Sequence, residues 1–294
     1  MNVRLMERGA LGAAVVLCLL TGSPSQGQFG PQKHEPKGPW ENKNLSPDER
    51  ADLVIGKMTL DEKIQLLHGL GWEVMFGPPP ESGPGTRAIR PSGFTPGVPR
   101  LGIPDLQITD AAVGVAGGGD KSRYATALPS AAAMAAGWDS ALSYETGTLI
   151  GSEVRAHGLN LSHGSGINLT REPRDGRTFE YKGEDPLLAG TLAGQELKAM
   201  KAMNVVTGVK HYILNDQEAG RMFVNSVIDK RSMRESDLLA FEIGLPGVAG
   251  GRSDVLVQQD QRCIRMRGRL LAERGIEERI RIQGLCDLRL GRYA

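Results

Sequence analysis

Cysteine is almost missing from the body of this chain. The 294 residues hold three cysteines, and none of them lies between Gln28 and Gly251. A disulfide framework and a cysteine-based metal site are therefore excluded for this stretch. The chain also lacks an excess of charge of either sign, because its formal net charge is +1. Without a strong field it has no long-range attraction for nucleic acid or for anionic lipid, so neither is expected as a partner.

Long hydrophobic runs are also scarce, and the clearest one, Leu11–Leu20, is too short to span a bilayer. Arg4 and Arg8 precede this run, and residues 1–27 as a whole are typical of a secretory signal peptide, with a buried helix as the alternative. The polar, proline-bearing residues 28–44 are predicted to form a flexible leader. We therefore expect a cleaved product that is exported to the periplasm or the extracellular space and is not held in a membrane.

Capping boxes predict where several helices begin. Each box places a glutamate three residues after a serine or threonine, and the boxes are Ser46-Pro-Asp-Glu49, Thr59-Leu-Asp-Glu62 and Ser232-Met-Arg-Glu235. The third box is predicted to open a helix that runs to about Ile243. A further helix is predicted from Asp139 to about His157, with Leu142, Leu149 and Ile150 on its core-facing side.

Strand-like segments alternate with these helices. Leu101–Asp110 reads as a strand that ends in an acid, Leu187–Met203 as a helix, and Asn204–Val209 as a short strand that leads into Lys210 and His211. Such alternation predicts a mostly parallel α/β architecture. Adjacent strand residues point to opposite faces, so Lys210 and His211 can reach one ligand only if the chain twists, bulges or ends there. Taken alone, the Lys-His pair would be an ordinary strand end.

The most informative stretch is Asn168–Pro186, which reads N-L-T-R-E-P-R-D-G-R-T-F-E-Y-K-G-E-D-P. So many charges cannot fill a core, because unpaired buried charge costs several kcal/mol. The stretch is either a salt-bridged surface loop or a loop that faces a polar ligand. Its spacing resembles the N-x-x-R-x-P-x-x-G-R-x-F-E-Y-x-x-E-D-P signature of glycoside hydrolase family 3.

Three further segments resemble that family in the same order. They are the G-I-P strand that ends in Asp110, the A-T-x-L-P-S and W-D elements of residues 125–139, and K-H-Y-I-L-N-D-Q-E-A-G-R from Lys210 to Arg221. The turn after Asp110 departs from the family, since Ala-Ala-Val-Gly stands where Gly-Pro-x-Gly is common. The segment after Lys-His favours the β-glucosidase branch over the branch that acts on N-acetylglucosaminides and carries K-H-F-P-G-H-G.

The resemblance implies a (β/α)8 TIM-barrel-like domain over residues 45–250, incomplete at its C-terminal end, since a full barrel takes about 250 residues. It implies a β-glucosidase-type retaining glycosidase that acts on a β-glucoside or oligosaccharide and needs no metal or organic cofactor. Asp110 would accept hydrogen bonds from sugar hydroxyls; Arg177, Lys210 and Arg221 would donate them, and His211 would do either. Glu180 and Glu218 are interpreted as supports that orient these cations.

Residues 251–294 differ in character from the rest. They contain ten arginines, no lysine and no helix or strand period. Read one nucleotide later with free codon choice, residues 252–262 give A-V-M-C-S-Y-N-K-I-N-G and residues 281–290 give G-F-K-G-F-V-I-S-D-W. Both strings resemble the next motifs of the family, and the aspartate of S-D-W is the family's catalytic nucleophile. We therefore interpret 251–294 as an out-of-frame tail.

Three hypotheses follow. The chain is an inactive fragment of a β-glucosidase that lacks its nucleophile and its acid/base in frame, because the acid/base of the family usually sits on a later domain. Alternatively, it is a folded, non-catalytic carbohydrate-binding protein. In the third, the tail is a genuine basic segment that recruits a partner. The coding DNA separates the first hypothesis from the third, and a sugar-responsive product would favour the second.

Overall fold

A computed structural model describes residues 37–70, 77, 80–89, 92–116, 124–220, 226–248 and 255–259, and for 246–248 and 255–259 it describes the backbone alone. The predicted signal peptide, residues 28–36, most of the tail and Arg221 lie outside the described residues. Within the described part, none of the helices has the length and the apolar composition of a bilayer span.

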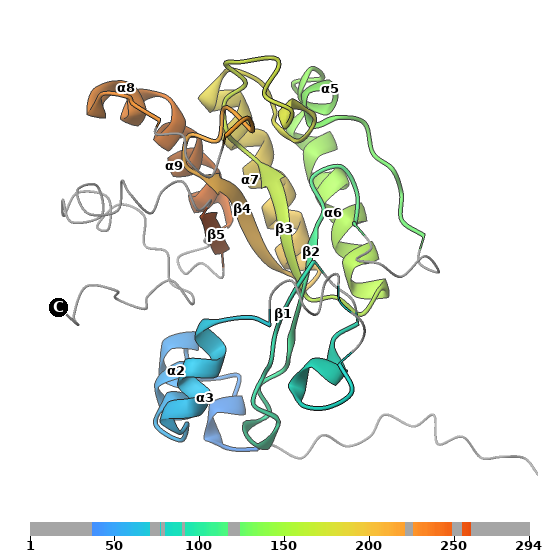
Figure 1. The fold of residues 1–294 in the computed structure, drawn as a ribbon, viewed down its shortest axis with the longest axis vertical. Coiled ribbons are helices and arrows are strands. Elements are labelled where there is room, and N and C mark those ends of the chain that lie inside the picture. The colour runs from blue at the N-terminus through green and yellow to red at the C-terminus, as the bar shows by residue number, and fades with distance from the viewer. Residues whose placement is uncertain are drawn as a thin grey trace, which may run out of the picture. The chain divides into compact units, whose positions relative to one another are not determined.

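One mixed sheet carries the fold (Figure 1). Its strands, in spatial as well as chain order, are β1 (Gly93–Thr95), β2 (Leu106–Asp110), β3 (Leu161–Gly166), β4 (Val206–Tyr212) and β5 (Val255–Gln259). β1 runs antiparallel to β2, and the other neighbours are parallel. Parallel neighbours need crossover connections, and helices supply them between β2 and β3, β3 and β4, and β4 and β5. This repeated strand–helix unit confirms the predicted TIM-barrel-like α/β fold.

Three of these crossover helices form a layer on the sheet. They are α6 (Ser140–Ala156), α7 (Pro186–Ala202) and α9 (Asp237–Val248). α7 lies between α6 and α9 and covers β3 and β4 (Figure 1). The shorter elements are α2 (Pro47–Ile55), α3 (Leu60–Leu67), α5 (Ala131–Ala135), α8 (Lys230–Glu235) and the 3-10 turns η1 (Pro39–Glu41), η2 (Pro84–Arg87), η3 (Pro99–Leu101) and η4 (Thr178–Glu180).

The core lies between this helix layer and the sheet. Leu197 and Met200 of α7 pack with Val209 of β4 and Phe241 of α9, and all four are fully buried. Burying each such side chain stabilises the fold by roughly 1.5–3 kcal/mol. The charged loops at the strand ends are thus held on a rigid base.

The buried face of α6 differs from the predicted one. Leu142 and Leu149 are exposed, and of the three predicted residues only Ile150 is buried. α6 approaches α7 through glycine: a Cβ on Gly147 would lie 2.3 Å from the carbonyl oxygen of Glu196. Helices that pack this closely need glycine at the point of contact. Leu142 and Leu149 flank Gly147, lie outside the contact with α7 and are exposed.

Helix starts follow the predicted boxes in two places. Ser46 and Thr59 each accept from a backbone amide three residues on, and the paired glutamates complete both boxes. The third predicted box is wrong. Asp229 caps α8 instead, because its carboxylate accepts from the amides of Arg231 and Ser232 at 3.0 Å each. α8 ends at Glu235, and the backbone of Ser236 is not helical, so α9 begins as a separate helix at Asp237.

Described elements lie beyond both predicted ends of the domain. Residues 38–44 were expected in a flexible leader, yet η1 buries Trp40, whose Nε1 donates to the carbonyl of Leu101 at 3.0 Å. Trp40 packs with Met58 and Val98 and so belongs to the folded part. In the tail, where no strand period was found, residues 255–259 form β5, parallel to β4 from Thr207 to Tyr212. The valines of V-L-V are residues that favour strands.

Candidate functional site

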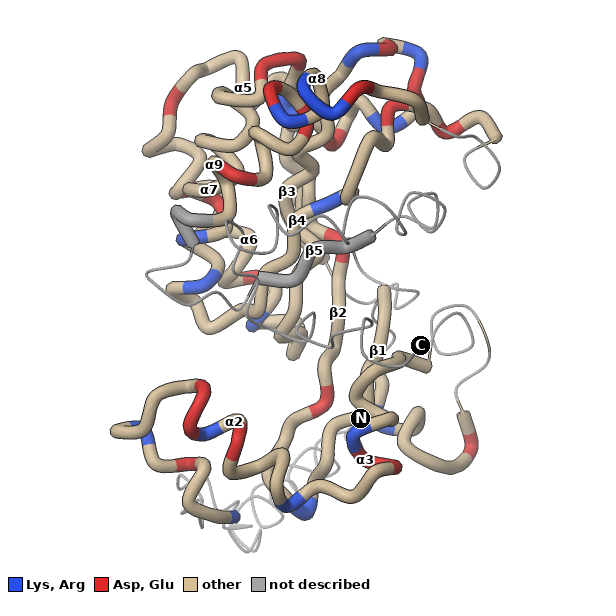
Figure 2. Tube along the Cα trace, turned by 90° about the vertical axis from the view of Figure 1, so that its left-hand side faces the viewer, with Lys and Arg blue, Asp and Glu red and all other residues tan. Residues whose placement is uncertain are grey.

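Charged residues of both signs gather around α8 and the neighbouring loops at one end of the sheet (Figure 2). Asp110 is the last residue of β2, Lys210 and His211 lie near the end of β4, and Arg177 and Glu180 come from the loop between β3 and α7. Because β2, β3 and β4 are parallel, their carboxyl ends meet at one edge. Barrel enzymes place their ligand-facing side chains at this edge.

Lys210 joins two carboxylates. Its Nζ lies 2.7 Å from Asp110 Oδ1 and 3.0 Å from Glu180 Oε2. The side chains of Lys210 and Glu180 are only 4% and 3% exposed, whereas that of Asp110 is 45% exposed. Burial raises the pKa of Asp110, but the charge and the hydrogen bond of Lys210 outweigh this effect, so the pKa falls below its ordinary value. Asp110 is therefore an ionised acceptor that a ligand can reach.

Arg177 occupies the neighbouring position. Its Nε lies 3.1 Å from Glu180 Oε1 and 3.2 Å from Glu218 Oε1, and its Nη2 lies 2.7 Å from His211 Nε2. A guanidinium can only donate, so Nε2 of His211 accepts and Nδ1 carries the ring proton. Nδ1 faces Tyr181 Oη at 3.0 Å. Burial, and next the charge of Glu180, raise the pKa of Tyr181 well above its ordinary value, so the phenol keeps its proton.

The strand pairing is irregular at Lys210 and His211, a condition for two adjacent strand residues to reach one ligand. The pairing of β3 with β4 shifts register before Lys210, and the pairing of β4 with β5 shifts before Tyr212. Asn168 holds this segment from the other side. Its Oδ1 accepts from the amide of His211 at 2.5 Å, and its Nδ2 donates to the carbonyl of His211 at 2.9 Å. The first residue of the charged stretch thus orients the Lys-His pair.

The structure brings together six of the seven residues that the sequence nominated. Asp110, Arg177, Glu180, Lys210, His211 and Glu218 form one connected group, which we call the charged cluster, and Arg221 lies outside the described residues. Glu180 contacts both cations and Glu218 contacts Arg177, the geometry expected of residues that orient them. No group of three or more His, Cys, Asp or Glu side chains among the described residues is arranged to hold a metal ion.

Sequence reasoning missed His163. The sequence analysis assigns no element to residues 161–166, yet Leu161–Gly166 is β3, and His163 stands opposite Asp110 in the parallel pair. Burial lowers the pKa of His163 to about 4. The negative charge of Asp110 opposes this shift, and the positive charge of Lys210 adds a smaller lowering. The ring is therefore neutral near pH 7. Only the strand register could have revealed this placement.

Two further groups hold the loops of the site. Arg171 forms a two-pronged ion pair with Asp237 at 2.7 and 2.6 Å and reaches Asp216 at 3.1 Å, which ties the charged loop to the start of α9. Burial, followed by the charge of Asp237, raises the pKa of Asp216 to about 6. On the other side, Lys182 Nζ lies 2.5 Å from Glu196 Oε1 of α7, and both side chains are buried.

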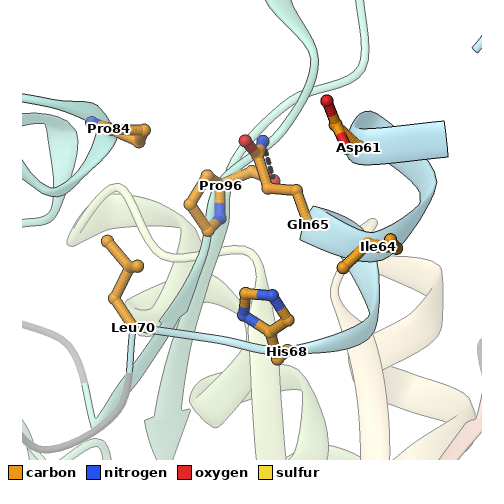
Figure 3. A pocket seen from close by; sticks show the side chains of 7 residues that line it. All are labelled: Asp61, Ile64, Gln65, His68, Leu70, Pro84 and Pro96. Atoms are coloured by element: carbon orange, nitrogen blue, oxygen red, sulfur yellow. Dashed lines mark hydrogen bonds between the residues drawn. The ribbon is translucent and has the colours of Figure 1, made fainter. Parts of the chain in front are cut away.

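A separate pocket of about 240 Å³ lies beside α3, and Figure 3 shows its lining. It is mostly apolar, with Ile64, Leu70, Pro84 and Pro96 among its residues. The amide of Gln65 is held by the carbonyls of Pro96 and Gly97 at 3.3 and 2.9 Å. None of the residues that line this pocket belongs to the charged cluster.

A parallel strand–helix repeat with a cluster of charged side chains at its carboxyl edge is typical of a TIM-barrel-like domain. Residues 97–250 match the model of the glycosyl hydrolase family 3 N terminal domain. The chain belongs to glycoside hydrolase family 3.

Relatives and solved structures agree with this family. The chain is 40% identical over 200 residues to the probable β-glucosidase I of Aspergillus fumigatus, a match that covers 66% of this chain and 21% of that protein. It is 33% identical over 197 residues to the thermostable β-glucosidase B of Acetivibrio thermocellus, covering 64% and 23%. β-Glucosidase 3B from Thermotoga neapolitana in complex with glucose superposes with a TM-score of 0.61 at 31% identity, covering 71% of this chain and 30% of that one. The chain thus spans about a fifth of the length of the curated relatives it matches.

Proposed function

We propose that this chain carries the sugar-binding part of a β-glucosidase-type retaining hydrolase that acts on the O-glycosyl bonds of β-glucosides or oligosaccharides. The observation that carries the proposal is the charged cluster at the carboxyl edge of the sheet, centred on Lys210 between Asp110 and Glu180. The β-glucosidase names of the relatives and the glucose complex of the Thermotoga neapolitana enzyme support it.

The charge balance of the cluster favours a neutral sugar over an anion. Among the described residues, two cations, Lys210 and Arg177, face three carboxylates, Asp110, Glu180 and Glu218, so carboxylates are in excess in this part of the site. A phosphate or carboxylate ligand would meet this excess of negative charge. Hydroxyl groups both donate and accept, so they suit an ionised acceptor that lies beside fixed donors. A glucose unit presents such hydroxyls around its ring.

Each residue has a distinct proposed role. Asp110 accepts from sugar hydroxyls, while Lys210 and Arg177 donate to them. The ring nitrogens of His211 face Arg177 and Tyr181, and its proposed contact with the sugar, as donor or acceptor, rests on the family resemblance. Arg221 is proposed as a further donor on the family resemblance alone. Glu180 and Glu218 hold the cations in place.

Hydrolysis with retention needs a nucleophilic carboxylate and an acid/base carboxyl about 5 Å apart. Glu180 is unsuited to either role, because it is buried and ion-paired to both cations. We propose that the nucleophile is the aspartate of the S-D-W string, which is read only in the shifted frame, and that the chain as given does not hydrolyse glycosides. The family match ends at residue 250, where the arginine-rich composition begins, and this supports an out-of-frame tail. Export to the periplasm or the extracellular space is proposed from residues 1–27.

A non-catalytic carbohydrate-binding role is the second candidate. It is favoured by the charged cluster itself, which is assembled from residues 110–218 without the tail. Under this reading the chain binds glucose and leaves glycosides intact.

The test compares the 294-residue chain with a version whose reading frame is restored and extended to the length of the relatives. We expect the chain to bind glucose in calorimetry and to leave an aryl β-glucoside intact. The restored enzyme should hydrolyse this substrate with retained configuration. Asp110→Ala in that enzyme should lower kcat/KM by about tenfold to hundredfold, since charge-assisted hydrogen bonds contribute about 1.5–3 kcal/mol each.

Turnover by the 294-residue chain that Asp110→Ala abolishes would show that the catalytic groups are misassigned. The DNA gives an independent check of the tail. Codons for 252–262 and 281–290 that cannot encode the two motifs in the shifted frame would remove the out-of-frame interpretation and favour a genuine basic segment.

A further inference from the structure

His163 lies at the charged cluster but has no role in the proposal above. In the parallel pairing of β2 with β3, His163 is the register partner of Asp110, and in the pairing of β3 with β4 it is the partner of Gly208. Residues in register across a sheet present their side chains on the same face. The imidazole therefore shares the ligand-facing side with Asp110, and the next strand offers no side chain at the matching position.

One nitrogen of the imidazole lacks a hydrogen-bond partner within the described residues. Its Nδ1 is buried and makes no hydrogen bond there. Burial holds the pKa of His163 at about 4, so the neutral ring has one donor and one acceptor nitrogen. An apolar side chain of similar size would avoid this burial of a polar atom. Asp110, the register partner of His163, is the exposed acceptor on this side of the sheet.

We propose that His163 is a specificity-determining residue that hydrogen-bonds a hydroxyl of the bound glucose unit next to the one held by Asp110. This inference rests on the proposed sugar-binding function and extends it to a residue on β3. The neutral ring suits this position, because a second cation here would compete with Lys210 for the carboxylate of Asp110.

The test uses the 294-residue chain with His163→Phe and His163→Gln, and His68→Gln as the control. His68 is exposed at the end of α3 and lines the separate pocket, away from the cluster. Affinities for glucose and for the four ring monodeoxyglucoses are measured by calorimetry, and near-UV circular dichroism checks the fold of each variant.

We expect His163→Phe to weaken glucose binding by about threefold to tenfold, the range of one neutral hydrogen bond. One monodeoxyglucose lacks the hydroxyl that His163 binds, and the unsubstituted chain should bind this sugar more weakly than glucose. His163→Phe should bind the same deoxy sugar as well as the unsubstituted chain does. His163→Gln, which keeps a donor and an acceptor, should recover part of the loss. His68→Gln should change nothing.

Equal losses for every sugar in His163→Phe would assign the ring a general packing role and overturn the proposal. Unchanged affinities would also overturn it. If His163→Phe does not fold, His163→Leu takes its place, and full glucose affinity in that variant together with the unsubstituted pattern of deoxy-sugar affinities decides against the proposal. A failure of the proposed function looks different: the unsubstituted chain would not bind glucose, or Asp110→Ala would not weaken binding, and both proposals would fall.

Discussion

The ion pair between Lys182 and Glu196 offers the sharpest test of how the charged loop is held. Lys182 Nζ lies 2.5 Å from Glu196 Oε1, and the two side chains are 2% and 3% exposed. The hydroxyl of Ser165 donates to the other carboxylate oxygen. Lys182 directly follows Tyr181 and stands two residues after Glu180, so this pair anchors the loop of the charged cluster to α7.

Removing one partner should be costly, because the other charge then stays buried. We expect Lys182→Met to lower the free energy of unfolding by about 3–5 kcal/mol. Domains are stable by only about 5–15 kcal/mol, so this loss is large. The double variant Lys182→Met/Glu196→Leu removes both charges at similar volume and should recover most of the stability, since well-packed apolar pairs often replace buried ion pairs without loss.

The assay is urea unfolding followed by far-UV circular dichroism at pH 7. The matched control is the exposed pair of Arg231 and Glu235, joined at 2.8 Å with side chains 85% and 63% exposed. Arg231→Met should cost less than about 1 kcal/mol, as exposed pairs do. A Lys182→Met loss no larger than the control, or a double variant as unstable as the single one, would refute the view that an uncompensated buried charge causes the effect.

Two further changes probe the site's surroundings. The pKa of Asp216 is raised from 3.8 to about 6 in the folded chain, so ionisation destabilises the fold, and the free energy of unfolding should fall as pH rises from about 4 through 6. Asp216→Asn should therefore stabilise the chain by about 1–3 kcal/mol at pH 7.5 and by little at pH 4 in urea titrations, whereas an equal change at both pH values would contradict this. Gly147→Ala should destabilise the chain by about 1–3 kcal/mol, because a Cβ there would lie 2.3 Å from the carbonyl oxygen of Glu196. A thermal midpoint that matches the unsubstituted chain would show that α6 and α7 can separate without loss.

The sequence predicts well those features that depend on neighbours along the chain. Ser46 and Thr59 cap their helices as expected, because a cap needs only an acceptor and an amide one turn away. The charged cluster is likewise predictable from motif spacing, since Asp110, Lys210 and Arg177 occupy positions that resemble one family's pattern. Ser232 fails as a cap because Asp229 provides a carboxylate acceptor one turn earlier.

Features that depend on long-range pairing are not predictable in this way. His163 reaches the charged cluster only because β3 pairs with β2 in one particular register, and no local pattern encodes that register. The buried face of α6 is set by the glycine contact with α7, so Leu142 and Leu149 are exposed despite their hydrophobicity. Sequence reasoning therefore identifies the members of the site more reliably than the contacts between elements.

Glu180 holds the two cations of the charged cluster in place. Its two oxygens are divided between Lys210 at 3.0 Å and Arg177 at 3.1 Å, and its side chain is 3% exposed. Both cations belong to long side chains that each carry about 2 kcal/mol of rotamer entropy, and these contacts fix them in the protein alone. Fixed donors need little reorganisation when a ligand arrives, which is how preorganised sites gain their selectivity. Asp110, the most exposed carboxylate of the three, remains the acceptor that a ligand can approach.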